Sequence, residues 1–223
     1  PGEESAQTRA RRPEGPAPPV APPMEAGCPG AVVDRLAVLR PIDYGRYETV
    51  TDLAALERFI AMAHETGIVG LSVQTDSPDP MRARIFGIAL APRPGTAAYV
   101  PLAQANGGGL DLSGAAPGTL KEVQVLEQLK PLLADEAVLK IGHNLKYETV
   151  LLLQRGLRVT PFDDPMLMSY VLDAGVNGHD LSELSELHLK HKAIALADLT
   201  GKGRDRVTLD KVPFEQATRY AAE

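Results

Sequence analysis

Apolar and polar residues follow a regular pattern through most of the chain. Residues 48–50 predict a short strand, and Thr51 with Asp52 after it predicts the cap and acidic first turn of a helix. We expect Gly67 to end this helix, because glycine readily adopts the left-handed conformation common at helix C-termini. Residues 68–74 form an apolar run typical of a strand at the centre of a sheet.

Two further strands and a series of helices complete the pattern. The strands are predicted at residues 85–90 and 97–102, joined by a turn at residues 92–95, so three successive strands form an antiparallel meander. A helix, a strand and a second helix are predicted at residues 120–133, 138–142 and 145–156, and the remainder is largely helical. This order predicts an α/β domain, a mixed sheet flanked by helices, as in ribonuclease-H-like folds.

Residues 1–46 lack this pattern. They are rich in Pro and Ala, include Pro-Glu-Gly-Pro-Ala-Pro-Pro, and contain few large apolar residues that could offset the entropy of ordering. We interpret this segment as a largely irregular interdomain linker, the alternative being a disordered tail, and residues 47–223 as the domain. Cys28, the only cysteine, lies in the linker, so no disulfide within the chain is possible.

Composition narrows the class of protein. Apolar residues make up 44% and charged residues 23% of the chain, as in ordinary globular proteins. The net charge of −6 argues against a protein that coats nucleic acid, but metal-dependent nuclease sites collect carboxylates and remain possible. No apolar run approaches the roughly 18 residues of a membrane span, and no signal peptide is evident, so we expect a cytoplasmic location.

One motif is specific enough to suggest a family. Residues 141–148, Ile-Gly-His-Asn-Leu-Lys-Tyr-Glu, resemble the second exonuclease motif of bacterial DNA polymerase I, G-x-N-x-K-Y-D, and ordered matches continue to Arg219-Tyr220-Ala221-Ala222-Glu223. The domain thus resembles the proofreading-type 3′-5′ exonuclease domain of family A polymerases. The resemblance implies a DEDD exonuclease-type fold, a role in DNA replication and repair, and a parent chain with an upstream 5′-nuclease and a downstream polymerase.

The resemblance also implies a metal site, which this sequence has mostly lost. The family holds two Mg²⁺ or Mn²⁺ ions with carboxylates, but Ser72 and Gln74 occupy the two first-strand positions. Glu148 replaces the Asp of the second motif, and Tyr220 remains in the third, whose Asp would follow Glu223. We therefore predict no active catalytic residue, weak or no metal binding at Glu148, and no bound cofactor. An active site would need Mg²⁺ or Mn²⁺.

Three neighbouring positions are candidates for DNA contact. The family lines its strand-binding cleft at the junction that holds Asn144, Lys146 and Tyr147 here, although a purely structural role is an equal alternative. We expect weak binding of a single-stranded 3′ end. Asp164 is expected to cap the helix that starts at Pro165 rather than to act in a site.

Three functions stay open. The first is an exonuclease-like domain of DNA polymerase I, a structural and DNA-contacting module without proofreading. The second is a working 3′-5′ exonuclease with a site rebuilt from Glu148, Asp76 and an Asp after Glu223. The third is a stand-alone decay nuclease of similar fold, which the linker and the polymerase-type matches disfavour. His188 and His191 are spaced like helical neighbours, and we expect a solvated helix end there rather than a metal pair.

Overall fold

The computed structural model describes residues 42–103, 118–175, 178–201 and 207–223. The predicted linker lies outside this range up to residue 41, and Cys28 with it. The last residues of the predicted linker are described and contain the 3₁₀ turn η1 (Tyr44–Arg46), which Asp43 caps by accepting from the backbone N–H of Gly45. The first element that the structure describes therefore lies just before the first predicted strand.

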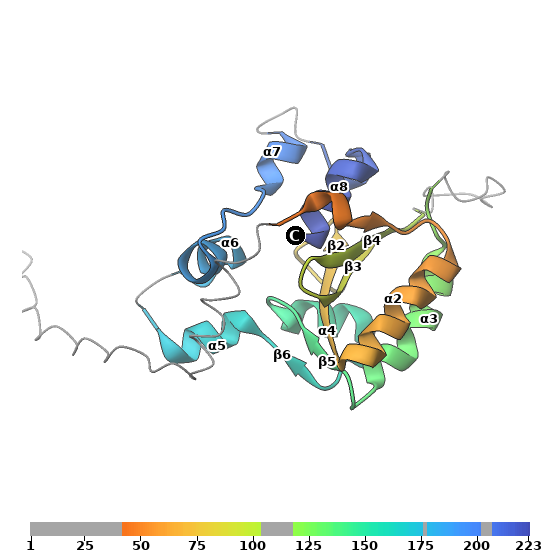
Figure 1. Cartoon of the computed structure of the whole chain (residues 1–223), viewed down its shortest axis with the longest axis horizontal. Helices are drawn as coiled ribbons and strands as arrows, with labels where there is room; N and C mark the ends of the chain where they lie inside the picture. The colour runs from red at the N-terminus through yellow and green to blue at the C-terminus, as the bar shows by residue number, and fades with distance from the viewer. Residues whose placement is uncertain (1–41, 104–117, 176–177, 202–206) are drawn as a thin grey trace, which may run out of the picture.

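Six strands of the described part form one mixed sheet at the centre of the molecule (Figure 1). The spatial order is β1-β4-β3-β2-β5-β6. In chain order the strands are β1 (Glu48–Thr49), β2 (Ile68–Thr75), β3 (Ile85–Arg93), β4 (Thr96–Pro101), β5 (Leu139–Ile141) and β6 (Phe162–Asp163). The predicted antiparallel meander is confirmed as β2-β3-β4, while β1, β5 and β6 each pair parallel to a neighbour.

Helices account for most of the remaining described residues. They are α2 (Leu53–Thr66), α3 (Glu122–Ala134), α4 (Leu145–Leu153), α5 (Pro165–Leu172), α6 (Leu181–Leu184), the π-helix η2 (Ser185–Leu189), α7 (Leu196–Thr200), the 3₁₀ turn η4 (Leu209–Lys211) and α8 (Phe214–Ala222). In Figure 1, α2 and α3 lie side by side on one side of the sheet, α8 lies near β3 and β4, and α5 and α6 lie away from α2 on the other side of the molecule. The prediction of a mixed sheet flanked by helices is confirmed.

Each face of the sheet has its own apolar cluster. The larger cluster joins α2, α3 and α4 to one face and includes Val73 and Ile88, which are cross-strand partners. The smaller cluster lies on the other face, where Ala89 and Tyr99 pack with Ala217 of α8. Because side chains alternate along a strand, Ser72, the partner of Ala89, points toward the α8 face.

Two local predictions were wrong in detail. Asp52, not Thr51, caps α2, because its carboxylate accepts a 2.8 Å hydrogen bond from the backbone N–H of Ala55. The turn between β3 and β4 is shorter than predicted, and β3 runs through Pro92 to Arg93. A register shift between Leu90 and Arg93 lets the strand accept a proline, which cannot donate to the ladder. Gly67 does end α2 in the left-handed conformation, as predicted.

None of the helices in the described ranges is long and apolar enough to cross a bilayer.

Candidate functional site

Ser72 and Gln74 lie together on the α8 face of β2. Val73 between them points into the larger apolar cluster and is 7% exposed, so the alternation of the strand turns both polar neighbours the other way. The Gln74 Nε2 donates to the Ser72 Oγ over 3.0 Å. The two-residue spacing puts both side chains on one face of β2, where they form a neutral hydrogen bond between a hydroxyl and an amide.

Glu148 reaches β2 from α4. The strand β5 pairs with β2 only as far as Gly70 and Ile141, so beyond that point one edge of β2 lacks a strand partner. The backbone N–H of Val73 lies on this stretch and donates to the Glu148 Oε1 over 2.8 Å. The carboxyl group thus takes the place of a missing strand partner. Its Oε1 has a structural role as the acceptor for a backbone N–H of β2.

The other oxygen of Glu148 changes the charge of the site. Oε2 is buried and has no hydrogen-bond partner among the described residues. Burial raises the pKa of the Glu148 carboxyl from its ordinary value of 4.5 to about 8, although the bond from Val73 acts in the opposite direction. At neutral pH the carboxyl is therefore mostly protonated, and Ser72, Gln74 and Glu148 together carry little negative charge.

The junction between β5 and α4 is fixed by backbone geometry. At Gly142 a Cβ would lie 2.6 Å from the carbonyl oxygen of Leu71, so no larger residue fits without moving the strand. Asn144 adopts a left-handed conformation with φ of 60° immediately before α4. This tight turn is what brings the first turn of α4, and hence Glu148, against β2.

Asp164 holds that junction from the other side. Its buried carboxylate accepts from the backbone N–H of Met166 at 2.9 Å, which confirms the predicted cap of α5. It also accepts from the N–H groups of Asn144 at 3.0 Å and Leu145 at 2.9 Å, at the start of α4. One side chain thus caps two helices, a link that the sequence prediction missed because it joins positions about twenty residues apart.

We expect Asp164→Asn to cost roughly 2–3 kcal/mol of unfolding free energy, because the amide loses an acceptor and sets an N–H₂ group against backbone donors. Urea unfolding at pH 7 measures this cost. Asp163→Asn is the matched control. Asp163 is half-buried and adjacent to Asp164 in the sequence, but it caps neither helix. Equal stability of the two variants would contradict the double-cap role.

The residues predicted to contact DNA differ in their surroundings. Tyr147 donates through its phenol OH to the carbonyl of Ser77 and also shares a 2.8 Å hydrogen bond with the Thr75 Oγ1. It therefore ties the end of β2 to α4, which supports a structural role for this side chain. Asn144 and Lys146 are exposed. A DNA-contacting role of these three positions stays a prediction.

The third motif lies on α8 next to a buried carboxylate. Tyr220 packs partly buried against the smaller cluster, and burial together with nearby Glu223 raises the pKa of its phenol. Glu223 accepts from the Tyr44 OH at 2.5 Å, the His191 Nε2 at 2.6 Å and the backbone N–H of Ile194 at 2.6 Å. The expected solvated helix end is thus wrong for His191, whose ring faces Glu223, and neither the sequence spacing nor the helix pattern signals this contact.

Asp76 turns away from the site. Its Oδ1 accepts from the backbone N–H of Arg84 at 2.8 Å, and its Oδ2 pairs with the Arg84 guanidinium at 2.7 Å. The ion pair closes the hairpin between β2 and β3, beyond the end of β2 at Thr75. Asp76 is therefore committed to the hairpin and does not supply a carboxylate beside Gln74.

These side chains do not fit a pair of divalent cations. Hard cations require several oxygen anions in a fixed arrangement, whereas the site offers one protonated carboxyl, one hydroxyl and one amide that already bond elsewhere. Within the described ranges no group of three or more His, Cys, Asp or Glu side chains is arranged to hold a metal. The absence of a bound cofactor stays a prediction.

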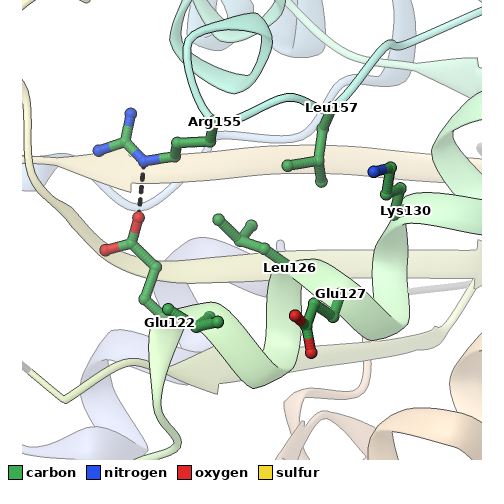
Figure 2. A pocket seen from close by; sticks show the side chains of 7 residues that line it. Glu122, Leu126, Glu127, Lys130, Arg155 and Leu157 are labelled. Carbon is green, nitrogen blue, oxygen red and sulfur yellow. Dashed lines mark hydrogen bonds and ion pairs between the residues drawn. The ribbon is translucent and has the colours of Figure 1, made fainter.

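A groove of about 370 Å³ lies elsewhere, between α3 and the segment that follows α4. Figure 2 shows Arg155 pointing toward Glu122 at one end of the groove, with Leu126 and Leu157 between Arg155 and Lys130. The Arg155 Nε pairs with the Glu122 Oε1 at 2.6 Å. Since the groove shares no residue with the Ser72, Gln74 and Glu148 site, it gives that site no substrate cavity.

Known proteins of similar sequence include DNA polymerases. The family described as 3′-5′ exonuclease matches residues 47–223. DNA polymerase I of Rhizobium leguminosarum is 44% identical over 193 residues, an alignment that covers 82% of this chain and 19% of the relative. The chain therefore spans about a fifth of the length of that relative.

Solved structures of similar fold include exonucleases that are distant in sequence. Escherichia coli RNase D, described as an exoribonuclease involved in structured RNA processing, superposes with a TM-score of 0.55 at 14% identity and covers 79% of this chain and 40% of its own. Brucella melitensis NrnC with bound Mg²⁺ superposes with a TM-score of 0.53 at 18% identity, covering 79% and 72%. At such identities the likeness confirms the ribonuclease-H-like fold alone.

Proposed function

Because the chain belongs to the family of 3′-5′ exonuclease domains found in DNA polymerase I, we propose that it is a form of that domain without proofreading activity. It serves as a structural and weakly DNA-contacting module in replication and repair. Its parent polypeptide carries an upstream 5′-nuclease and a downstream polymerase and works in the cytoplasm. The length of its relatives, about five times that of the aligned region, supports a multidomain parent.

The observation that carries this proposal is the hydrogen bond between Gln74 and Ser72. Two-metal hydrolysis needs anionic oxygens that position one ion for the attacking water and another for the leaving oxygen. Here the two positions on β2 satisfy each other, and the carboxyl of Glu148 satisfies the backbone of Val73. The chain keeps the scaffold of the site while its polar groups hold the scaffold together.

What remains at the site suits contact rather than hydrolysis. Ser72, Gln74 and Glu148 carry little negative charge, so in the absence of metal they repel a phosphodiester less than a cluster of carboxylates does. Lys146 is exposed in the first turn of α4, the helix that carries Glu148, and is the cation that would contact a phosphate. The net charge of −6 opposes tight binding of the backbone as a whole, so binding of a single-stranded 3′ end is weak and falls with salt.

We expect no metal-dependent shortening of a 5′-labelled single-stranded oligonucleotide with Mg²⁺ or Mn²⁺, because one protonated carboxyl cannot hold two ions. The assay compares this chain, the same chain extended through the rest of the third motif, and the Glu148→Ala variant of each. The extended form is included because the family's remaining carboxylate ligand for the metal would follow Glu223.

Shortening by the extended form that Glu148→Ala abolishes would support the active-exonuclease alternative. Shortening that persists in Glu148→Ala points to a contaminating or separate nuclease and is resolved by repeating the assay after a further purification step. Only unchanged oligonucleotide in all four samples agrees with the proposed function.

A further inference from the structure

Lys140 of β5 is buried without a carboxylate partner. Its side chain is fully buried, although lysine is rarely buried unless it is paired. Within the described ranges its Nζ forms no ion pair with an Asp or Glu side chain. The carboxylate of nearby Asp135 bonds elsewhere, since its Oδ1 accepts from the Ala137 N–H at 2.8 Å and its Oδ2 lies 3.1 Å from the His64 Nδ1. Another kind of partner must therefore offset the cost of burying an ammonium here.

Four backbone carbonyl oxygens lie around the Nζ of Lys140. They belong to Thr160 at 2.5 Å, Val138 at 2.7 Å, Asp135 at 2.8 Å and Leu132 at 3.4 Å. We name these four oxygens the carbonyl cage. Separate parts of the chain supply them, namely the last turn of α3, the turn between α3 and β5, and the segment just before β6. The oxygen from α3 lies at the negative end of the helix dipole, which favours a cation.

The carbonyl cage suits a cation better than a neutral amine. A protonated lysine has three N–H donors and no acceptor, so all of its polar hydrogens can face oxygens. A neutral amine would turn its lone pair toward one of these oxygens. Burial lowers the pKa of this amine, whereas hydrogen bonds from its charged form to the cage act in the opposite direction. Carbonyl oxygens arranged around K⁺, an ion similar in size to ammonium, likewise replace its hydration shell. The ligand class that fits the cage is thus a small monovalent cation.

We propose that the carbonyl cage is a binding site for one monovalent cation, which the Lys140 ammonium fills, and that it accepts free ammonium or K⁺ once this amine is removed. The cage shares no residue with the candidate site on β2, so the inference does not depend on the proposed function. The bound cation joins the end of α3 to Thr160, from which the chain runs through β6 to Asp164, the residue that caps α4 and α5. Lys140 is therefore a positioning residue for this segment.

Lys140→Met tests the proposal, because methionine keeps the length of the side chain as far as the lysine Cε and removes only the amine. In tetramethylammonium chloride, whose cation is too large for the cage, we expect the Tm of this variant to lie roughly 10 °C or more below that of the wild type, since the carbonyls lose a charged donor. Ammonium chloride or KCl at the same concentration is expected to restore at least about half of this loss by binding to the folded state. Lys130→Met, at an exposed lysine on α3, is the matched control, and its Tm is expected to be the same in the three salts.

The comparison between the two variants decides the result. A rise in Tm in ammonium chloride or KCl that is confined to Lys140→Met supports the proposal. Equal Tm values of Lys140→Met in all three salts overturn it. A rise of the same size in Lys130→Met also overturns it, because the effect would then not come from the cage.

NMR of the wild-type chain, uniformly labelled with ¹³C and ¹⁵N, decides the question if Lys140→Met does not fold in any salt. We expect one ammonium signal, assigned to Lys140 through its side-chain carbons, whose protons exchange with water at least about tenfold more slowly than those of exposed lysines. This nitrogen is expected to couple across its hydrogen bonds to the carbonyl carbons of Val138 and Thr160. A neutral amine, or an ammonium without these couplings, would overturn the proposal.

Discussion

Replacing Glu148 with glutamine is expected to stabilise the domain by roughly 3–5 kcal/mol above pH 8 and to leave it nearly unchanged below pH 5. Burial raises the pKa of this carboxyl from 4.5 to about 8 in the folded chain. Each unit of such a shift corresponds to about 1.4 kcal/mol of differential stability. Glutamine keeps an oxygen for the N–H of Val73 and carries no charge at any pH.

The sign of this pH dependence follows from the number of protons that the folded and unfolded states bind. Between about pH 4.5 and 8 the folded state keeps a proton on Glu148 that the unfolded state has lost, so the wild-type chain loses stability as the pH rises through this range. Above pH 8 both states are ionised, and the difference between wild type and variant reaches its full value. Below pH 4.5 both carry the proton, and the difference vanishes.

Urea unfolding at pH 5, 7 and 9 measures the effect. Glu127→Gln, at an exposed glutamate on α3, is the control, and we expect it to follow the wild type within about 0.5 kcal/mol at every pH. If Glu148→Gln instead shows the same pH dependence as the wild type, then Glu148 ionises freely in the folded chain. The picture of a nearly neutral site would then be wrong.

The order of elements could be predicted from the sequence because each is encoded locally. The apolar run at residues 68–74 and the glycine at position 67 fix β2 and the end of α2 by their own composition. Errors of one or two residues, such as Thr51 for Asp52, arise because adjacent residues have similar capping propensities and only the hydrogen bond decides.

Contacts between distant segments could not be predicted in this way. Lys140 lies in a predicted strand, yet it is fully buried, and its Nζ donates to the backbone carbonyls of Val138 at 2.7 Å and, 20 residues further along the chain, of Thr160 at 2.5 Å. Nothing in the local pattern distinguishes it from an exposed strand lysine. Burial lowers the pKa of this amine, an effect that Asp135 opposes.

In the candidate site too, positions could be predicted from the sequence, whereas contacts between distant segments could not. The resemblance located Ser72, Gln74 and Glu148, but nothing in the sequence predicted the hydrogen bond between the first two side chains. The bond from the N–H of Val73 to Glu148 joins positions 75 residues apart, and it depends on where β5 ends. The sequence could therefore indicate which charges had been lost, but not that the remaining carboxyl is protonated and structural.

Restoring both charges on β2 tests whether the shape of the site survives. In the Ser72→Asp and Gln74→Glu double variant two carboxylates lie on the α8 face of β2, where the present side chains are 3.0 Å apart. Without metal, their repulsion is expected to destabilise the domain by roughly 2–4 kcal/mol, a Coulomb energy reduced for partial exposure. Ionisation of Glu148 is opposed further by the new charges, so its proton stays on to higher pH.

Divalent cations are expected to reverse this loss before any hydrolysis appears. Binding to the folded state alone contributes about 2.7 kcal/mol at a hundredfold excess over Kd, which raises the Tm of a domain of this size by roughly 5–10 °C. Thermal unfolding across a titration with Mg²⁺ or Mn²⁺ measures this shift. Gln124→Glu with Gln216→Glu is the matched control, since it adds two carboxylates at exposed positions on separate helices. A metal-dependent rise in Tm no larger than in this control would mean that the face of β2 has changed in shape as well as in charge, because two carboxylates at the family's positions would then fail to gather even one ion.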